Sequence, residues 1–136
     1  MNDKSQATTA LKAVQEETGR LLRRAERHIA DYTAKMNDNF VRFFEWNAEE
    51  MYKEQLKRHF FEGLNSMLAG WDGEDLAADL LKAAKSKADG IVRGSLTRNS
   101  TNQMANHAHL LTLQAAQEII HELENLAFVA NHYAEQ

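Results

Sequence analysis

Apolar residues in the first third of the chain recur at the spacing of a single helix face. When each residue is advanced by ~100° around a helix, they fall within an arc of about 140°. The arc does not shift between Met36 and Phe40, although the polar triplet Asn-Asp-Asn at 37–39 lies between them. Asn and Asp cost at most about 0.7 kcal/mol each inside a helix, which a packed aromatic face offsets. The pattern therefore predicts one helix over residues 6–45.

The triplet at 37–39 is also a candidate turn, because Asn and Asp are frequent turn residues. A turn there would give four helices of similar length. Such helices form a self-contained up-down bundle that could be monomeric. This alternative stays open at the level of the sequence.

Beyond Trp46 the apolar stripe is rotated by roughly 80°, which indicates a break near Trp46-Asn47. Asn47 followed by Glu50 reads as a capping box, so a second helix is predicted over 48–69. The segment GWDGED, residues 70–75, is the clearest turn, and Asp72 is expected to cap the helix that follows it.

That third helix is predicted over 73–89, ending at Gly90 as a C-terminal glycine. Ser100 with Gln103 forms another capping box and opens a last helix over 100–134. The 136 residues are therefore expected to form one helical domain, 1–136.

A helix of ~40 residues is about 60 Å long, whereas one of ~22 residues covers only ~33 Å. The long first and last helices would overhang the middle two and leave apolar surface in water. A second copy in antiparallel arrangement is the simplest cover, because two-fold pairing is the commonest oligomer. The predicted fold is all-α: an elongated four-helix bundle with long first and last helices that forms a homodimer.

Composition supports a helical protein and narrows its environment. The chain has no proline, which favours helices joined by short connections, and no cysteine, which excludes disulfides and thiolate metal sites. No signal peptide and no membrane span are visible, so a cytoplasmic location is expected. The net charge of −4 gives no general attraction to nucleic acid.

Seven of the eleven aromatic residues lie between positions 40 and 61, and they point in too many directions for one buried face. Most of them are accounted for by a core. Aromatic side chains are also enriched at protein interfaces, so part of the cluster is a candidate interaction surface. Its members are Phe40, Phe43, Phe44, Trp46, Tyr52, Phe60 and Phe61.

Four arginines form a basic ridge on the first helix, opposite its apolar stripe: Arg20, Arg23, Arg24 and Arg27. Such a ridge could hold phosphates, nucleic acid or an acidic partner. Acidic residues stand at pairing distance on the same helix, at Glu16, Glu26 and Asp31. A salt-bridged face in contact with water is the favoured interpretation.

Histidines and carboxylates on the last helix share one polar stripe that includes His107, Glu118, His121 and His132. Glu118 and His121 form the E-x-x-H spacing of di-iron four-helix bundles. Those sites need a second such motif and further inward carboxylates, which the chain lacks. The stripe is therefore predicted to face water, and no metal or other cofactor is expected.

Two short segments resemble phosphotransfer proteins. HELENL at 121–126 is similar to the phosphoacceptor box of sensor histidine kinases, and HLLT at 109–112 is similar to the motif of histidine phosphotransfer domains. The resemblance implies a four-helix protein in which His121 accepts a phosphoryl group. The basic residue and proline of the kinase motif, and the lysine and glycine of the phosphotransfer motif, are absent here.

Trp71-Asp72-Gly73 between two helices resembles the W-x-G turn of the WXG100 secreted proteins. The resemblance covers about residues 48–90 and implies a secreted helical hairpin that dimerises. The export signal of that family is not present after Tyr133.

No arrangement of a nucleophile, a phosphate loop or paired inward carboxylates is visible in the sequence. The expected function is non-enzymatic: an adaptor, chaperone or inhibitor that offers an aromatic-rich helical surface to a larger protein. The phosphotransfer, secreted-hairpin and arginine-ridge interpretations are the alternatives.

Overall fold

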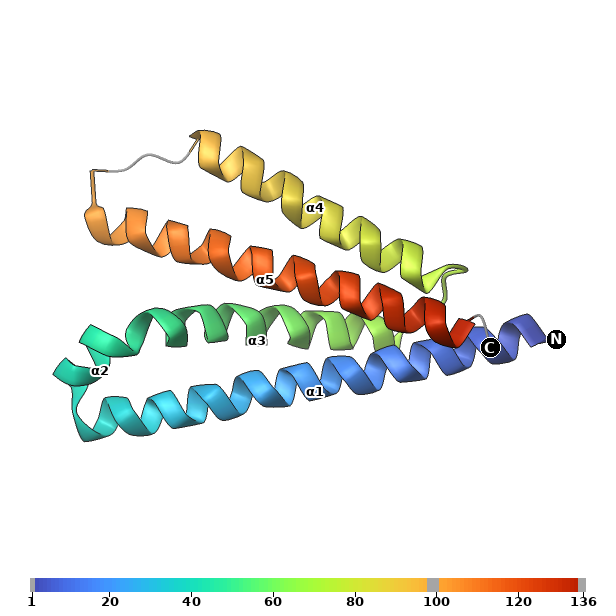
Figure 1. The fold of residues 1–136 in the computed structure, drawn as a ribbon, viewed down its shortest axis with the longest axis horizontal. Coiled ribbons are helices and arrows are strands. Elements are labelled where there is room, and N and C mark those ends of the chain that lie inside the picture. Colours follow the sequence, from blue (N-terminus) through green and yellow to red (C-terminus); the bar gives the residue numbers. More distant parts are fainter. Residues whose placement is uncertain (1, 98–100, 135–136) are drawn as a thin grey trace.

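The computed structural model describes residues 2–97 and 101–134, and these residues form five α-helices and no strand (Figure 1). In chain order the helices are α1 (Asn2–Asp38), α2 (Phe40–Trp46), α3 (Ala48–Ala69), α4 (Leu76–Thr97) and α5 (Gln103–Ala134). The four long helices alternate in direction, and α2 is a short crosspiece that joins α1 to α3 at one end. The all-α prediction is confirmed.

The prediction of a continuous helix over 6–45 is wrong, because the chain bends at Asn39. Asn39 has an extended backbone (φ −153°, ψ 96°), and its Oδ1 accepts a hydrogen bond of 3.1 Å from the Arg42 N–H. The side chain thus caps the start of α2. Helical bonding resumes on both sides, from Asn39 N–H to the Lys35 carbonyl and from Phe43 N–H to the Asn39 carbonyl. A bend of one residue hardly changes the spacing of apolar residues, so their phase could not reveal it.

The predicted break near Trp46-Asn47 is confirmed, since α2 ends at Trp46 and α3 begins at Ala48. The capping box expected there is not formed, because the Asn47 side chain makes no capping hydrogen bond. Glu50, the other half of the expected box, instead forms an ion pair of 3.1 Å with Lys53. With two closely spaced bends, α1 and α3 become an antiparallel pair. α1 has 37 residues and α3 has 22, so α1 still extends past α3, but it does so at its N-terminal end and not at the aromatic residues of α2 (Figure 1).

The ends of the later helices also differ from the prediction. Asp75, rather than Asp72, caps α4, because its Oδ1 accepts a hydrogen bond of 3.1 Å from the Ala78 N–H. α4 then continues through Gly90 to Thr97, seven residues beyond the glycine that was expected to end it. Asn102 caps α5 through a bond of 3.0 Å from the Ala105 N–H. The expected cap Ser100 lies outside the described residues.

Each long helix in the described chain packs against at least two others, but α3 and α4 do not pack closely against each other. α5 lies against α1, α3 and α4, and α1 lies against α3. α3 and α4 follow one another in the chain, but within the described residues none of their Cα atoms come within 8 Å of each other. Figure 1 shows α4 diverging from α3 toward the end where α2 lies. The two helices that flank Trp71-Asp72-Gly73 therefore do not form a closely packed hairpin.

The hydrophobic core is concentrated toward the end of the bundle that contains the α3–α4 loop. One cluster there joins side chains from all four long helices: Val14, Leu21, Phe61, Leu64, Leu68, Leu76, Ala77, Leu80, Ala84, Ile119, Leu123, Leu126, Ala127 and Ala130. Toward the α2 end, the buried side chains of Phe43, Leu111 and Ala115 lie outside this cluster. We call the two ends the loop end and the α2 end.

Candidate interaction surface

Helix α2 places its aromatic side chains on both sides of one buried anchor. Phe43 is only 5% exposed, whereas Phe40, Phe44 and Trp46 are 59%, 51% and 75% exposed. At ~100° per residue, Phe40 and Phe44 lie on one side of Phe43 and Trp46 lies on the other. The rings of Phe40 and Phe44 are 6.1 Å apart between centroids, so they form one continuous apolar surface. α2 is thus held by a single phenylalanine and exposes three large aromatic side chains.

A groove of about 510 Å³ runs beside Phe44, between the start of α3 and the start of α5. We call it the apolar groove. Its lining consists of Phe44, Glu45, Ala48, Glu49, Tyr52, Met104, His107, Ala108 and Leu111. The two alanines leave room between larger side chains, and the volume lies within the range of known ligand pockets. Because Phe44 borders both features, the groove continues the exposed surface of α2.

Two polar contacts tie the walls of the apolar groove together. The hydroxyl groups of Tyr52 on α3 and Thr112 on α5 share a hydrogen bond of 3.1 Å. Nearby, the imidazole of His107 on α5 contacts the carboxylate of Glu49 on α3. These contacts fix the spacing of α3 and α5 where the hydrophobic core is sparse, so the groove has defined walls.

Trp46 lines a second hollow, of about 600 Å³, on the opposite side of α2. This corner is polar: Lys35, Asp38, Asn39 and Arg42 line it together with Asn47 and the edge of Phe43. One exposed tryptophan therefore lies among amide and charged groups, whereas Phe44 lines an apolar groove and Phe40 lies against Phe44. Only the latter side combines exposed aromatic rings with an apolar cavity.

The predicted aromatic surface therefore divides into three parts. Phe40, Phe44, Trp46 and Tyr52 are exposed at the α2 end. Phe43 and Phe61 are buried, and Phe61 belongs to the main core cluster. Phe60 is half-buried: its ring meets that of Phe61 edge-on at 5.7 Å, and the Lys87 ammonium lies 4.8 Å from its centroid. Phe43, Phe60 and Phe61 are thus packing residues.

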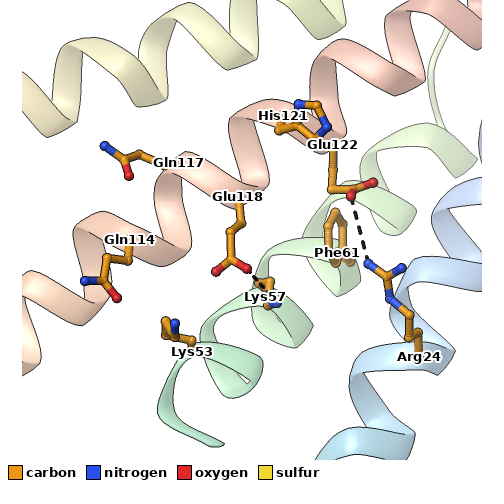
Figure 2. A pocket seen from close by; sticks show the side chains of 9 residues that line it. All are labelled: Arg24, Lys53, Lys57, Phe61, Gln114, Gln117, Glu118, His121 and Glu122. Atoms are coloured by element: carbon orange, nitrogen blue, oxygen red, sulfur yellow. Dashed lines mark ion pairs between the residues drawn. The ribbon is translucent and has the colours of Figure 1, made fainter. Parts of the chain in front are cut away.

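A third hollow, of about 450 Å³, is polar and lies among α1, α3 and α5 (Figure 2). Lys57 stands at its centre, 2.8 Å from a Glu54 oxygen and 3.6 Å from a Glu118 oxygen. Arg24 reaches across to Glu122 at 3.9 Å. Because Arg24 and Lys57 each have a carboxylate partner, these charges link the three helices and neutralise one another.

The polar stripe of α5 is exposed as predicted, and part of it borders this polar hollow. His107, Glu118, His121 and His132 are all exposed, and Glu118 and His121 line the hollow. No group of three or more histidine and carboxylate side chains in the described chain is arranged to hold a metal ion. None of the described helices contains an apolar run long enough to cross a membrane.

The basic ridge divides in the structure. Arg20 pairs with Glu17 rather than with the expected Glu16, and the hydrogen bond from Arg20 lowers the pKa of the Glu17 carboxyl. Arg24 turns toward the polar hollow, while Arg23 and Arg27 are exposed. Two of the four arginines therefore already have carboxylate partners within the chain.

Sequence reasoning missed the groove itself. Met104, Ala48 and Ala108 line it, but small and flexible side chains carry no signal of a cavity until the register of two helices is known. No protein-family model matches the chain, and no curated protein or solved structure is significantly similar to it.

Proposed function

We propose that this chain is a non-enzymatic interaction protein that binds another protein through the α2 end. The observation that supports this most is the exposure of Phe40 and Phe44 beside a preformed apolar groove. Contiguous exposed apolar surface of this kind is typical of interaction sites, whereas scattered single residues are ordinary. An adaptor, a chaperone or an inhibitor would use such a surface.

Phe40 and Phe44 are large apolar side chains that the fold leaves exposed to water. Burying a phenylalanine side chain is worth about 1.5–3 kcal/mol relative to leaving it in water. The core of the chain takes up Phe43 and leaves its neighbours Phe40 and Phe44 exposed. A partner that covers both rings would gain several kcal/mol, and the helical walls need little rearrangement.

Self-association through the same surface stays a prediction. A second copy is the simplest partner to test first, because two-fold pairing is the commonest oligomer. The earlier reason for pairing, an overhanging stripe that includes Phe43, no longer holds because Phe43 is buried. Exposed Phe40, Phe44 and Trp46 now provide the reason.

The test replaces Phe40 and Phe44 together by serine and compares light-scattering mass and partner capture from extracts of the native host. Both side chains are exposed, so the circular dichroism spectrum should be unchanged. Association should fall at least tenfold, the loss expected from about 1.4 kcal/mol or more of apolar contact.

The matched control replaces Val92 and Phe128 together by serine. These side chains are about as exposed as Phe40 and Phe44 or more so, but they lie on α4 and α5 outside the groove. This control should associate like the original chain. Unchanged association of the Phe40→Ser/Phe44→Ser protein, or equal loss in the control, would show that the α2 end is not the binding surface.

A further inference from the structure

The apolar groove has a charge pattern as well as a shape. Its lining includes two carboxylates, Glu45 and Glu49, and one imidazole, His107, but no lysine or arginine. Both carboxylates are exposed, next to the apolar rings of Phe44 and Tyr52, and the Glu49 carboxylate also contacts the His107 imidazole. A bound partner would therefore meet an apolar floor beside an acidic rim.

The walls of the groove also limit the backbone form of a partner. α2, α3 and α5 are helices, so the N–H and C=O groups of these walls, except those in the terminal turns, are bonded within each helix. There is no strand edge to which an extended peptide could add itself. A partner segment would meet few free backbone groups here and would have to satisfy most of its own backbone hydrogen bonds, as an α-helix does.

We infer that the apolar groove binds an amphipathic helix whose apolar stripe is flanked by lysine or arginine. This inference rests on the proposed function and specifies the chemistry of the partner. Apolar side chains of the helix would lie against Phe44, Ala108 and Leu111, while its cations would face Glu45 and Glu49. Met104 is 62% exposed, and its flexible thioether side chain adapts to varied apolar side chains.

In a second copy, the described basic helices are already packed into their own core. α1 carries the arginines and buries Val14, Leu21 and Ala25, and α4 carries lysines and buries Leu76, Leu80 and Ala84. On α1, Arg20 and Arg24 are engaged by Glu17 and Glu122. The partner is accordingly a different protein.

The test uses two fluorescent 18-residue helical peptides with leucine at helical spacing, one with lysine and one with glutamate at the polar positions. Fluorescence anisotropy measures their binding to the full chain at low and moderate salt. The Leu/Lys peptide should bind, more weakly as salt rises, and the Leu/Glu peptide should bind at least tenfold more weakly. Glu45→Gln with Glu49→Gln should weaken Leu/Lys binding roughly 2- to 30-fold, the range for two exposed ion pairs.

Two further variants distinguish binding in the groove from a general attraction of a basic peptide to an acidic protein. Glu62→Gln with Glu124→Gln removes the same charge from exposed positions that line none of the hollows described above, and should leave binding unchanged. Ala108→Trp places a large ring in the groove and should abolish binding while the helical spectrum is kept.

Equal binding of both peptides, or equal loss in the two glutamine pairs, would overturn the basic-helix inference. If Ala108→Trp then blocked both peptides, the groove and the proposed function would still stand. Leu/Lys binding that persists in Ala108→Trp would show that the groove is not the site. A different result would assign the groove to a second copy of the chain. In that case neither peptide binds, and the chain self-associates in a way that Ala108→Trp abolishes.

Discussion

The two tryptophans lie at opposite ends of the bundle and differ in how far they are packed and hydrogen-bonded. Trp71, at the loop end, packs against the core cluster and donates a hydrogen bond of 2.9 Å from Nε1 to Asp79 Oδ2. Trp46, at the α2 end, is 75% exposed and lies in a polar corner. The difference shows that the loop end is built to hold the fold together, whereas the α2 end carries apolar surface that the fold does not use.

The backbone at the loop end is adapted to its tryptophan. A Cβ atom added to Gly73 would lie 3.0 Å from the Trp71 ring and 3.0 Å from Asp79 Oδ2. A methyl group at this position would have to push the Trp71 ring or the Asp79 carboxylate aside. The W-D-G motif is therefore explained by a local packing requirement, with no need for a resemblance to secreted proteins.

The largest expected effect comes from the buried phenylalanines at the two ends. Phe61→Ala should destabilise the chain by roughly 3–5 kcal/mol, because Phe61 lies in the main cluster and its removal leaves a cavity. Phe43→Ala should cost less, about 2–3 kcal/mol, because Phe43 anchors only α2 and the hollow that it lines beside Trp46 can relax. Urea unfolding measures both, with the exposed Phe44→Ala as control. Equal losses for Phe61 and Phe43 would show that the α2 end is as tightly packed as the loop end.

The tryptophans give the next effect. Trp71→Ala removes packing against the core and leaves Asp79 without its donor, so about 2–3 kcal/mol should be lost. Trp46→Ala should change the free energy of unfolding by at most about 0.5 kcal/mol, as surface substitutions usually do. Thermal unfolding of the two variants compares them directly. A large loss in Trp46→Ala would mean that the ring stabilises the bend between α1 and α3.

Two glycines at the loop end provide a sharper comparison. Gly73→Ala should cost roughly 1–2 kcal/mol, because the new methyl group crowds a ring that is fixed by its hydrogen bond. Gly70→Ala should be tolerated, since no atom lies within 4 Å of the added Cβ. Chemical unfolding and the near-ultraviolet signal of Trp71 report the difference. If Gly73→Ala left both unchanged, the Trp71 packing would be looser than described.

The bend at Asn39 can be tested in the same way. Asn39→Ala removes the cap of α2 and should destabilise the chain by about 1 kcal/mol. The exposed neighbour Asn37→Ala is the control and should have little effect. Hydrogen exchange should locate the loss of protection in α2 and leave the loop end unchanged. If both ends lost protection equally, the α2 end and the loop end would not differ in local stability.

Most of the fold could be predicted from apolar spacing, but the bends and caps could not. The stripes of α1, α3 and α5 are long and periodic, so their existence was plain. Asn39 and Asp75 act as caps through one side-chain bond each, and nearby Asn37, Asp38 and Asp72 are chemically equivalent candidates. The choice among such candidates depends on which bend lets distant apolar faces meet.

Helix α4 continues past its expected end because of a tertiary contact. Gly90 and Gly94 lower the helical propensity of α4, yet α4 passes through both. A Cβ atom on Gly94 would lie 3.2 Å from the His109 ring, so glycine permits close packing against α5. His109 Nε2 lies 3.2 Å from the Gly94 carbonyl oxygen, which is consistent with a hydrogen bond between the helices. A tertiary contact of this kind leaves no mark in the sequence of α4 alone.

The smallest predicted effect concerns two threonines in α1. Thr18 is completely buried, and its hydroxyl has no hydrogen-bond partner among the described residues, so Thr18→Val should stabilise the chain by about 1 kcal/mol. Thr33, nearer the α2 end, donates a bond of 2.8 Å to the Ile29 carbonyl, so Thr33→Val should be neutral or destabilising by up to about 1 kcal/mol. Urea unfolding of the pair is sensitive to the sign of each change, which matters more than its size. Destabilisation by Thr18→Val would mean that the Thr18 hydroxyl has a hydrogen-bond partner in solution, and that water reaches the core at the loop end.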